Sequence, residues 1–322
     1  MAIVDRVKIV VPGDDPPQIQ NSPHLTRLEP YGDIITYSDR PETLDEKIAR
    51  ARGATVLINS RTFVTWPAEA LSQLAELRLI ATCSIGTDMI DLEMAQSMGI
   101  VVCNQPGRTA PVVAEHMFGL MFALAKRAAF QTTEVRAGRW GMLENVFLQG
   151  KTLGVIGTGS FGSEMARLGK ALGMNILAWT FHPSRERGDA LSVQFVELDE
   201  LLRDADVVSL HVRLTDETYH MIGSRELTLM KRGVLLVNGA RGGVVDTDAL
   251  VQALNSGHIA GAALDVFEEE PLSIDHPLLS CEQVIFTPHV ADMTPEAIDW
   301  LNEGAVDNVI AFLEGSPQNL VT

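Results

Sequence analysis

Side chains that could bind an anion or transfer a proton stand at or just past the ends of apolar, strand-like runs in the last third of the sequence. These are Arg241, the three glutamates at 268–270 and His289. Arginine offers a planar, two-pronged donor that matches a carboxylate. Histidine titrates near neutral pH, with a free pKa of about 6.5, and a carboxylate neighbour favours its protonated form. A site built from these groups could bind a carboxylate and protonate a developing alkoxide.

Taken singly, each feature has an ordinary structural explanation. Arg241 could be a surface arginine in a glycine loop, the glutamates a solvated loop and His289 a structural histidine. One glutamate could instead be turned inward by Pro271. We expect the groups to meet, because the carboxyl ends of parallel strands share the edge of the sheet where ligands bind.

A glycine-rich turn, GTGSFG at 157–162, follows the strand-like run 153–157 and precedes a helical pattern. In such a turn the first glycine permits a tight bend, the second lets the backbone approach a pyrophosphate and the third lets the helix pack close to the strand. Free N–H groups and the positive helix end then hold the phosphates. The sequence therefore predicts dinucleotide binding. The residues expected to provide it here are Gly157, Gly159, Ser160, Phe161 and Gly162.

The end of the next strand-like run, 175–179, bears on which dinucleotide is bound. An acidic side chain there normally bonds the ribose hydroxyls and repels a 2′-phosphate, but the position holds Thr180, and Arg185 and Arg187 follow. Threonine can donate to a phosphate, and either arginine could neutralise its charge. The alternative is that both arginines belong to a solvated helix start, offset by Glu186. We expect NAD(P), with NADP slightly favoured over NAD.

Apolar strand-like runs alternate with helical patterns along almost the whole chain. Runs that are apolar on both faces suit a buried parallel sheet, and the alternation is typical of an α/β doubly wound architecture. The runs expected to form strands are 7–11, 55–59, 77–83, 100–104, 153–157, 175–179, 207–211, 233–238, 261–266 and 283–289.

Helix signals and the mid-chain glycine turn indicate two domains. Thr43–Glu46 is a capping box, residues 110–138 are expected to form one long helix bridging two regions, and Thr294 is expected to open a final helix. Because a dinucleotide domain begins with the strand before its glycine turn, separate α/β structure must precede it. We expect two Rossmann-like doubly wound parallel-sheet domains with a cleft between them. Their expected bounds are 1–104 plus 291–322 for a flavodoxin-like substrate domain and 105–290 for a dinucleotide-binding domain.

The composition limits the partners and the compartment. Of the 322 residues 46% are hydrophobic, and the formal charge is −17, which suits a globular core and disfavours nucleic acid and anionic membranes as partners. The three cysteines lie far apart, which indicates reduced thiols in the cytoplasm and no metal site. The start of the chain resembles a strand and not a signal peptide, and the apolar stretch 118–125 is too short to span a bilayer.

The combined motifs resemble the D-isomer-specific 2-hydroxyacid dehydrogenase family over nearly the whole chain. Residues 83–107 and VVAEH at 112–116 look like that family's first-domain signature, while 210–222 and NGARGGVVD at 238–246 look like its cofactor-domain signatures. The resemblance implies interconversion of a small 2-keto acid and its D-2-hydroxy acid, with glyoxylate- or hydroxypyruvate-like substrates favoured. It also implies a homodimer built largely through the cofactor domain.

The same resemblance assigns roles to single residues. It implies that Arg241 holds the substrate carboxylate and polarises its carbonyl, and that His289, paired with Glu270, transfers the proton. Asp265 matches the residue that contacts the nicotinamide amide. The remaining expected contacts are Thr109 and His211 for the cofactor, and Ser84, Ile85 and Gly86, with Arg241 and His289, for the substrate.

Some positions depart from the family's pattern. Arg213 stands where a proline is common, so its loop could be reshaped, and Asp292 stands where a small residue is usual, facing substrate or solvent. Phosphoglycerate dehydrogenases tend to carry arginine at the position of Asn59, which disfavours a phosphorylated substrate, although Arg61 could compensate.

Other functions on this fold stay open. Formate dehydrogenases carry glutamine where Glu270 stands, which argues against formate, whereas phosphite oxidation is compatible with these residues. A non-catalytic, NAD-sensing corepressor is a further alternative, because such proteins can retain the catalytic residues. Their long disordered extensions do not occur in this sequence, which favours an enzyme.

Overall fold

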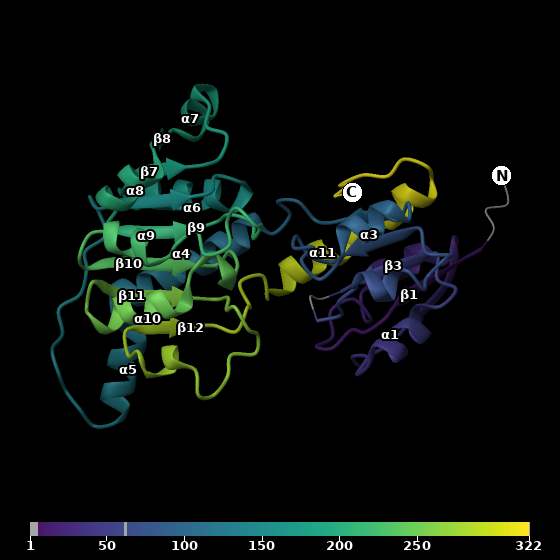
Figure 1. Cartoon of the computed structure of the whole chain (residues 1–322), viewed down its shortest axis with the longest axis horizontal. Helices are drawn as coiled ribbons and strands as arrows, with labels where there is room; N and C mark the ends of the chain where they lie inside the picture. The colour runs from purple at the N-terminus through teal and green to yellow at the C-terminus, as the bar shows by residue number, and fades with distance from the viewer. Residues whose placement is uncertain (1–5, 61–62, 322) are drawn as a thin grey trace. The chain divides into compact units, whose positions relative to one another are not determined.

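The computed structural model describes residues 6–60 and 63–321, so Arg61 lies outside the described residues. The chain forms two compact units, Met1–Thr109 with Met293–Thr322, and Ala110–Asp292. Each unit is built around its own parallel sheet, drawn as two groups of arrows in Figure 1. The C-terminal segment therefore belongs to the first unit.

The first unit contains a five-stranded parallel sheet in the order β2-β1-β3-β4-β5. Every residue of β3 and β4 is buried, as is typical of strands covered on both faces. This strand order is that of a flavodoxin-like doubly wound sheet. The strands are β1 (Val7–Val11), β2 (Gly32–Thr36), β3 (Val56–Asn59), β4 (Leu79–Thr82) and β5 (Val101–Cys103).

Two hydrophobic clusters cover the two faces of this sheet. Ile48 and Leu71 belong to one, whereas Leu28 and Val306 belong to the other. The helices that contribute to the two clusters are α1 (Leu44–Ala51), α2 (Ala68–Leu71), α3 (Leu92–Ser97), α11 (Pro295–Leu313) and the 3-10 helix η1 (Pro23–Leu28).

Side-chain caps begin four of these helices, α1, α3, α11 and η1. Thr294 accepts the N–H of Ala297 at the start of α11, as expected. At the start of α1, Thr43 Oγ1 accepts the N–H of Glu46 at 3.2 Å, but the Glu46 carboxylate accepts the N–H of Glu42 at 2.8 Å. The expected capping box is therefore only half formed, because the reciprocal bond goes to the residue before the cap.

The second unit contains a seven-stranded parallel sheet in the order β12-β11-β10-β9-β6-β7-β8. The chain proceeds from β6 outward to β8 and then returns to place β9 on the other side of β6. This reversal is the topological switch point at which dinucleotides bind in doubly wound sheets. The strands are β6 (Thr152–Ile156), β7 (Asn175–Trp179), β8 (Gln194–Phe195), β9 (Val207–Leu210), β10 (Val234–Asn238), β11 (Ile259–Leu264) and β12 (Val284–Phe286).

Helices again lie on both faces of the sheet. Met121 and Met165 join one hydrophobic cluster, and Leu202, Leu227 and Leu250 join the other. The elements are α4 (Ala110–Ala125), α5 (Ala128–Arg136), α6 (Ser160–Ala171), α7 (Arg185–Leu191), α8 (Leu198–Asp204), α9 (Ser224–Leu229), α10 (Thr247–Asn255) and the 3-10 helices η2 (Gly242–Val244) and η3 (Pro277–Ser280).

The single long helix expected over 110–138 is wrong, because α4 and α5 are separate helices. Arg127, between them, has a left-handed backbone with φ of 50°, which ends the α-helical hydrogen-bond pattern. The ten expected strands are all present, while β2 and β8 were not expected. Among the described residues no helix is long and apolar enough to cross a membrane.

Candidate active site at the carboxyl edge of the second sheet

His289 and Glu270 form a direct pair in the second unit. The Nδ1 atom of His289 lies 2.8 Å from Oε2 of Glu270, and each side chain is 32% exposed. The hydrogen bond to Glu270 raises the pKa of His289 above its usual value, although burial opposes this. Burial raises the pKa of Glu270, but hydrogen bonds from His289 and the Phe267 N–H bring it below its usual value. The pair thus favours an imidazolium beside a carboxylate.

Asp265 fixes the turn that carries His289. Its carbonyl oxygen accepts the His289 N–H at 2.8 Å, and its carboxylate accepts the N–H groups of Val290 at 3.0 Å and Ala291 at 3.1 Å. Asp265 is 1% exposed. The turn needs this support because His289 has a positive φ of 53°, which is strained for a residue with a side chain. The expected contact of Asp265 with a nicotinamide amide stays a prediction.

Thr287 and His116 extend this network and were not anticipated as site residues. Thr287 Oγ1 donates to Asp265 Oδ1 at 2.6 Å, and His116 Nε2 lies 3.2 Å from Thr287 Oγ1. Burial raises the pKa of Asp265, but hydrogen bonds from His116, Thr287 and Val290 lower it overall. The available signal was the VVAEH motif, which places His116 on α4 facing the carboxyl end of the sheet.

Arg241 follows β10 and lies in the electrostatic field of the same pair. Its carbonyl oxygen accepts from Asn238 Nδ2 at 3.0 Å, and its Nη1 donates to the carbonyl of Ala240 at 2.8 Å. Besides the larger effects of hydrogen bonds and burial, the positive charge of Arg241 lowers the pKa of both Glu270 and His289. The structure therefore brings together the three residues expected to be catalytic.

The glycine turn has the geometry of a phosphate cradle. Gly157 has φ of 91°, and a Cβ there would lie 2.7 Å from the carbonyl oxygen of His211. A Cβ at Gly162 would lie 1.9 Å from the carbonyl oxygen of Gly157, so the start of α6 packs directly on the turn. Gly159 is the N-cap of α6, and a Cβ there would meet nothing within 4 Å. The helix begins with Ser160 and Phe161. The space beside Gly159 therefore lies at the N-terminus of α6, where a pyrophosphate could bind.

Arg187, and not Arg185, reaches the glycine turn. The Arg187 guanidinium donates to the carbonyl oxygen of Thr158. The Arg185 side chain is 95% exposed, and its Nε lies 3.9 Å from Asp189. Ser184 Oγ caps α7 by accepting the Arg187 N–H. Thr180 follows β7 directly and is half-buried.

His211 lies at the end of β9 beside Gly157. Its Nε2 is 2.9 Å from Ser209 Oγ. The side chain keeps some exposed surface, yet protein surrounds it closely enough that burial lowers its pKa to about 4. The environment of His211 therefore favours the neutral imidazole, whereas that of His289 favours the protonated form.

The remaining expected contacts belong to the first unit. After β4 the loop at Ser84, Ile85 and Gly86 is held by internal bonds, since Ser84 Oγ donates to the Gly86 carbonyl at 3.0 Å and Asn104 donates to the Ile85 carbonyl at 2.7 Å. Thr109 is buried and precedes α4. These four residues lie in the first unit, apart in sequence from Arg241, Glu270 and His289.

Asn59 is committed to the core of the first unit. Its Oδ1 accepts from Trp66 Nε1 at 3.0 Å and its Nδ2 donates to the Val64 carbonyl at 3.2 Å. Of the positions that depart from the family pattern, Arg213 is exposed and Asp292 is half-buried.

Comparison with known proteins identifies the family of this chain. Residues 118–291 match the family model described as D-isomer specific 2-hydroxyacid dehydrogenase, NAD binding domain. The chain is 41% identical over 308 residues to a glyoxylate reductase of Aeropyrum pernix, covering 92% of each protein. It resembles the D-lactate dehydrogenase of Aquifex aeolicus complexed with NAD and lactic acid (TM-score 0.84, 32% identity, 96% of each chain). It also resembles an acyclic imino acid reductase complexed with NADPH and D-Arg (TM-score 0.89, 25% identity, 98% of this chain and 100% of that one).

Proposed function

Because this chain belongs to the D-isomer specific 2-hydroxyacid dehydrogenase family, we propose that it reduces a small 2-keto acid to the D-2-hydroxy acid with a nicotinamide cofactor. The observation that carries the proposal is the His289–Glu270 pair at 2.8 Å, in the field of Arg241. In this proposal the second unit binds the cofactor and the first contributes substrate contacts.

The chain's own residues supply the acid and the anion clamp. Glu270 occupies Nδ1 of His289, so Nε2 is the nitrogen that donates the proton to the forming alkoxide. The raised pKa of His289 favours the protonated form of that nitrogen. Arg241 binds the substrate carboxylate through its fork and stabilises the negative charge that develops on the carbonyl oxygen. The bound nicotinamide supplies the hydride.

Small, unphosphorylated acids such as glyoxylate and hydroxypyruvate are the favoured substrates. The side chain of Asn59 is engaged by Trp66 and Val64 and offers no cation for a phosphate. The glyoxylate reductase from Aeropyrum pernix, similar over 92% of this chain, supports the same substrate class.

NADP(H) is the favoured cofactor in this proposal. Thr180 places no carboxylate at the end of β7 to repel a 2′-phosphate. Arg187 brings a guanidinium to the turn proposed to receive the pyrophosphate, so of the two expected arginines it is the one assigned to the phosphate. Structural relatives include complexes with NAD and with NADPH, so the fold accommodates both.

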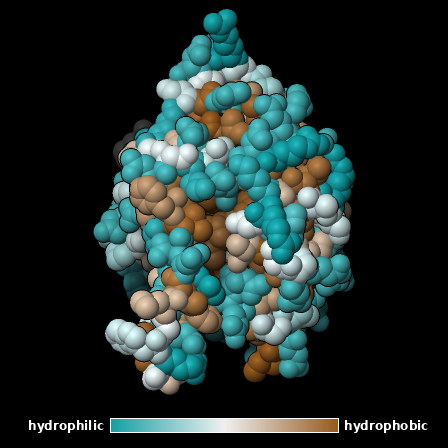
Figure 2. All heavy atoms as spheres, turned by 90° about the vertical axis from the view of Figure 1, so that its left-hand side faces the viewer, coloured by the Kyte–Doolittle hydropathy of each residue, from teal (hydrophilic) through white to brown (hydrophobic). Residues whose placement is uncertain are grey.

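The proposed assembly is a homodimer formed through the second unit. The segment after α5 runs along the left edge of Figure 1 and exposes Trp140, Met142 and Phe147. A hollow of about 250 Å³ lies next to it, lined by Leu124 and Phe130 among others. Figure 2 views that side of the molecule and shows brown, hydrophobic atoms at the surface between teal ones. A two-fold partner would bury both features at once, as a self-complementary interface requires.

A substrate panel tests the proposed activity. Glyoxylate, hydroxypyruvate, pyruvate and bulkier 2-keto acids are assayed with NADH and NADPH, and the chirality of each product is determined. We expect the highest kcat/KM with the small acids and a D-product wherever a stereocentre forms. If no 2-keto acid is reduced with either cofactor by a folded protein that binds the cofactor, the proposal is overturned.

A further inference from the structure

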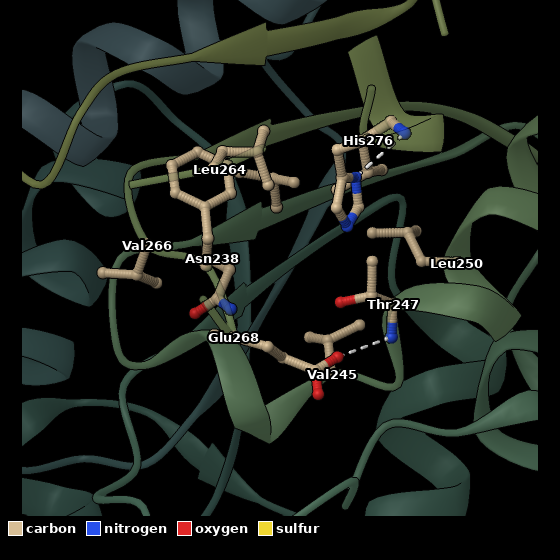
Figure 3. A pocket seen from close by; sticks show the side chains of 12 residues that line it. Asn238, Val245, Thr247, Leu250, Leu264, Val266, Glu268 and His276 are labelled. Atoms are coloured by element: carbon tan, nitrogen blue, oxygen red, sulfur yellow. Dashed lines mark hydrogen bonds between the residues drawn. The ribbon is translucent and has the colours of Figure 1, made fainter. Parts of the chain in front are cut away.

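Glu268, two residues before Glu270, uses both of its carboxylate oxygens to hold neighbouring segments. Oε1 accepts the backbone N–H of Thr247 at 3.1 Å, and Oε2 lies 3.1 Å from Nε2 of His220. Figure 3 shows the Glu268 carboxylate directed at Thr247, which is the first residue of α10. Burial raises the pKa of Glu268, but the bonds from Thr247 and His220 lower it overall, so the carboxylate is ionised.

The segments that Glu268 joins are the ones that carry the anion clamp. His220 donates its N–H to the carbonyl of Gly243 at 2.7 Å. A Cβ on Gly242 would lie 1.9 Å from the carbonyl carbon of Phe267, so the two backbones touch. Arg241 immediately precedes this contact, and its place is therefore set by how the segment at 242–247 lies against the segment at 266–268.

The same loop also carries the partner of the proton donor. Glu270 turns toward His289, whereas Glu268 turns toward His220 and Thr247. Phe267 connects the two glutamates: it precedes Glu268 in the chain, and its backbone N–H donates to Glu270 Oε1 at 3.0 Å. One short loop is thus fastened on one side to the Arg241 segment and on the other to the His289 turn.

The cavity beside Glu268 does not offer an alternative role as a ligand site. Its volume is about 20 Å³, and its lining includes Asn238, Thr247, Phe267 and His276. That space suffices for about one water molecule. The carboxylate therefore serves the protein's own segments.

We propose that Glu268, with His220, is a positioning residue that sets the spacing between Arg241 and the His289–Glu270 pair. The inference rests on the proposed function for its catalytic consequence. Neither Glu268 nor His220 touches the substrate in this proposal. Loss of the link lets the anion clamp and the acid drift apart, and misplacement of about 1 Å can cost on the order of 10²-fold in rate.

Kinetics of matched variants test the catalytic consequence. Glu268→Ala is expected to lower kcat/KM for the keto acid by about 10- to 100-fold, with the cofactor Kd and the Tm nearly unchanged. Glu268→Gln should recover most of the loss, because its amide oxygen still accepts from Thr247 and its NH2 group can donate to His220. The control is Glu269→Ala, which removes the same charge from the exposed neighbouring position and should behave as wild type.

The competing results are distinct. If Glu268→Ala matches Glu269→Ala, or if Glu268→Gln is as impaired as Glu268→Ala, the positioning role is overturned. A loss that follows cofactor affinity and Tm together would also overturn it, because that pattern marks general destabilisation.

Amide hydrogen exchange tests the link without any substrate. In Glu268→Ala the amide of Thr247 and its neighbours in 242–247 should exchange faster than in wild type and in Glu269→Ala. Unchanged exchange overturns the link even in an active enzyme. Failure of the substrate panel would instead overturn the proposed function while this measurement still decides whether Glu268 holds the segments.

Discussion

Glu270 Oε2 lies 2.8 Å from His289 Nδ1, which leaves the Nε2 face of the imidazole for a reacting group. His289→Ala should therefore lower kcat by roughly 10²–10⁴, the usual contribution of a positioned general acid. Cofactor Kd, measured by fluorescence titration, should stay close to wild type, because the side chain donates a proton and holds no phosphate. Near-normal turnover by the folded variant would remove His289 from the mechanism.

Glu270→Gln should change the pH dependence of reduction. Reduction needs protonated His289, so kcat/KM is at its maximum at low pH and falls as the pH rises through the pKa of His289. The hydrogen bond to the Glu270 carboxylate raises that pKa, against burial. Glutamine removes the negative charge, so the fall should move to lower pH. The measurement is kcat/KM for reduction as a function of pH, for wild type and Glu270→Gln. Identical profiles would show that Glu270 does not raise the pKa of His289.

Arg241→Lys should be severely impaired although the charge is retained. Lysine cannot offer the two parallel N–H donors that match a carboxylate. We expect KM for the keto acid to rise and kcat to fall, measured at saturating cofactor. Unchanged kinetics would place the carboxylate site elsewhere.

Cofactor choice should depend on Thr180 and Arg187. Thr180→Asp and Arg187→Ala should each lower the ratio of kcat/KM for NADPH over NADH, because the first adds a repelling charge and the second removes an attracting one. Arg185→Ala is the control, since that side chain is 95% exposed and should leave the ratio unchanged. A wild type that strongly prefers NADH would show that the missing carboxylate only weakens the ribose contact.

Trp140→Ser should weaken self-association. The exposed Trp140 side chain lies in the segment after α5, where a partner would cover it. Sedimentation velocity over a range of concentrations should show a dimer for wild type and a shift toward monomer for the variant. A monomeric wild type would contradict the proposed interface.

Much of the fold could be predicted because its signals are local. The central strands are apolar on both faces, and the glycine turn needs residues without a Cβ at 157 and 162. The two strands that were not expected have weak signals: β2 alternates buried and exposed positions, and β8 has only two residues. The break at Arg127 could not be predicted, because the surrounding sequence continues the helical pattern across it.

The positions of candidate site residues could be predicted where the residues directly follow a strand. They were harder to predict where the conformation of a loop or short helix sets the direction of the side chain. Arg241, Asp265 and His289 follow strands of one sheet, so parallel topology alone gathers them. Arg185 and Arg187 are two residues apart on one short helix, and only the direction of α7 decides which of them reaches Thr158. Likewise, nothing in three consecutive glutamates shows that Glu268 and Glu270 turn to different partners.

The left-handed backbone of His289 makes protein stability and the proposed catalysis compete at one position. Such a conformation costs on the order of 1–3 kcal/mol in a residue with a side chain, and glycine would adopt it without that cost. The substitution that most relieves the backbone would therefore also delete the proposed proton donor. Efforts to make this chain more heat-resistant should leave the turn after β12 alone and seek their gains at sites such as the exposed helix surfaces, where rigidity and chemistry are not in conflict.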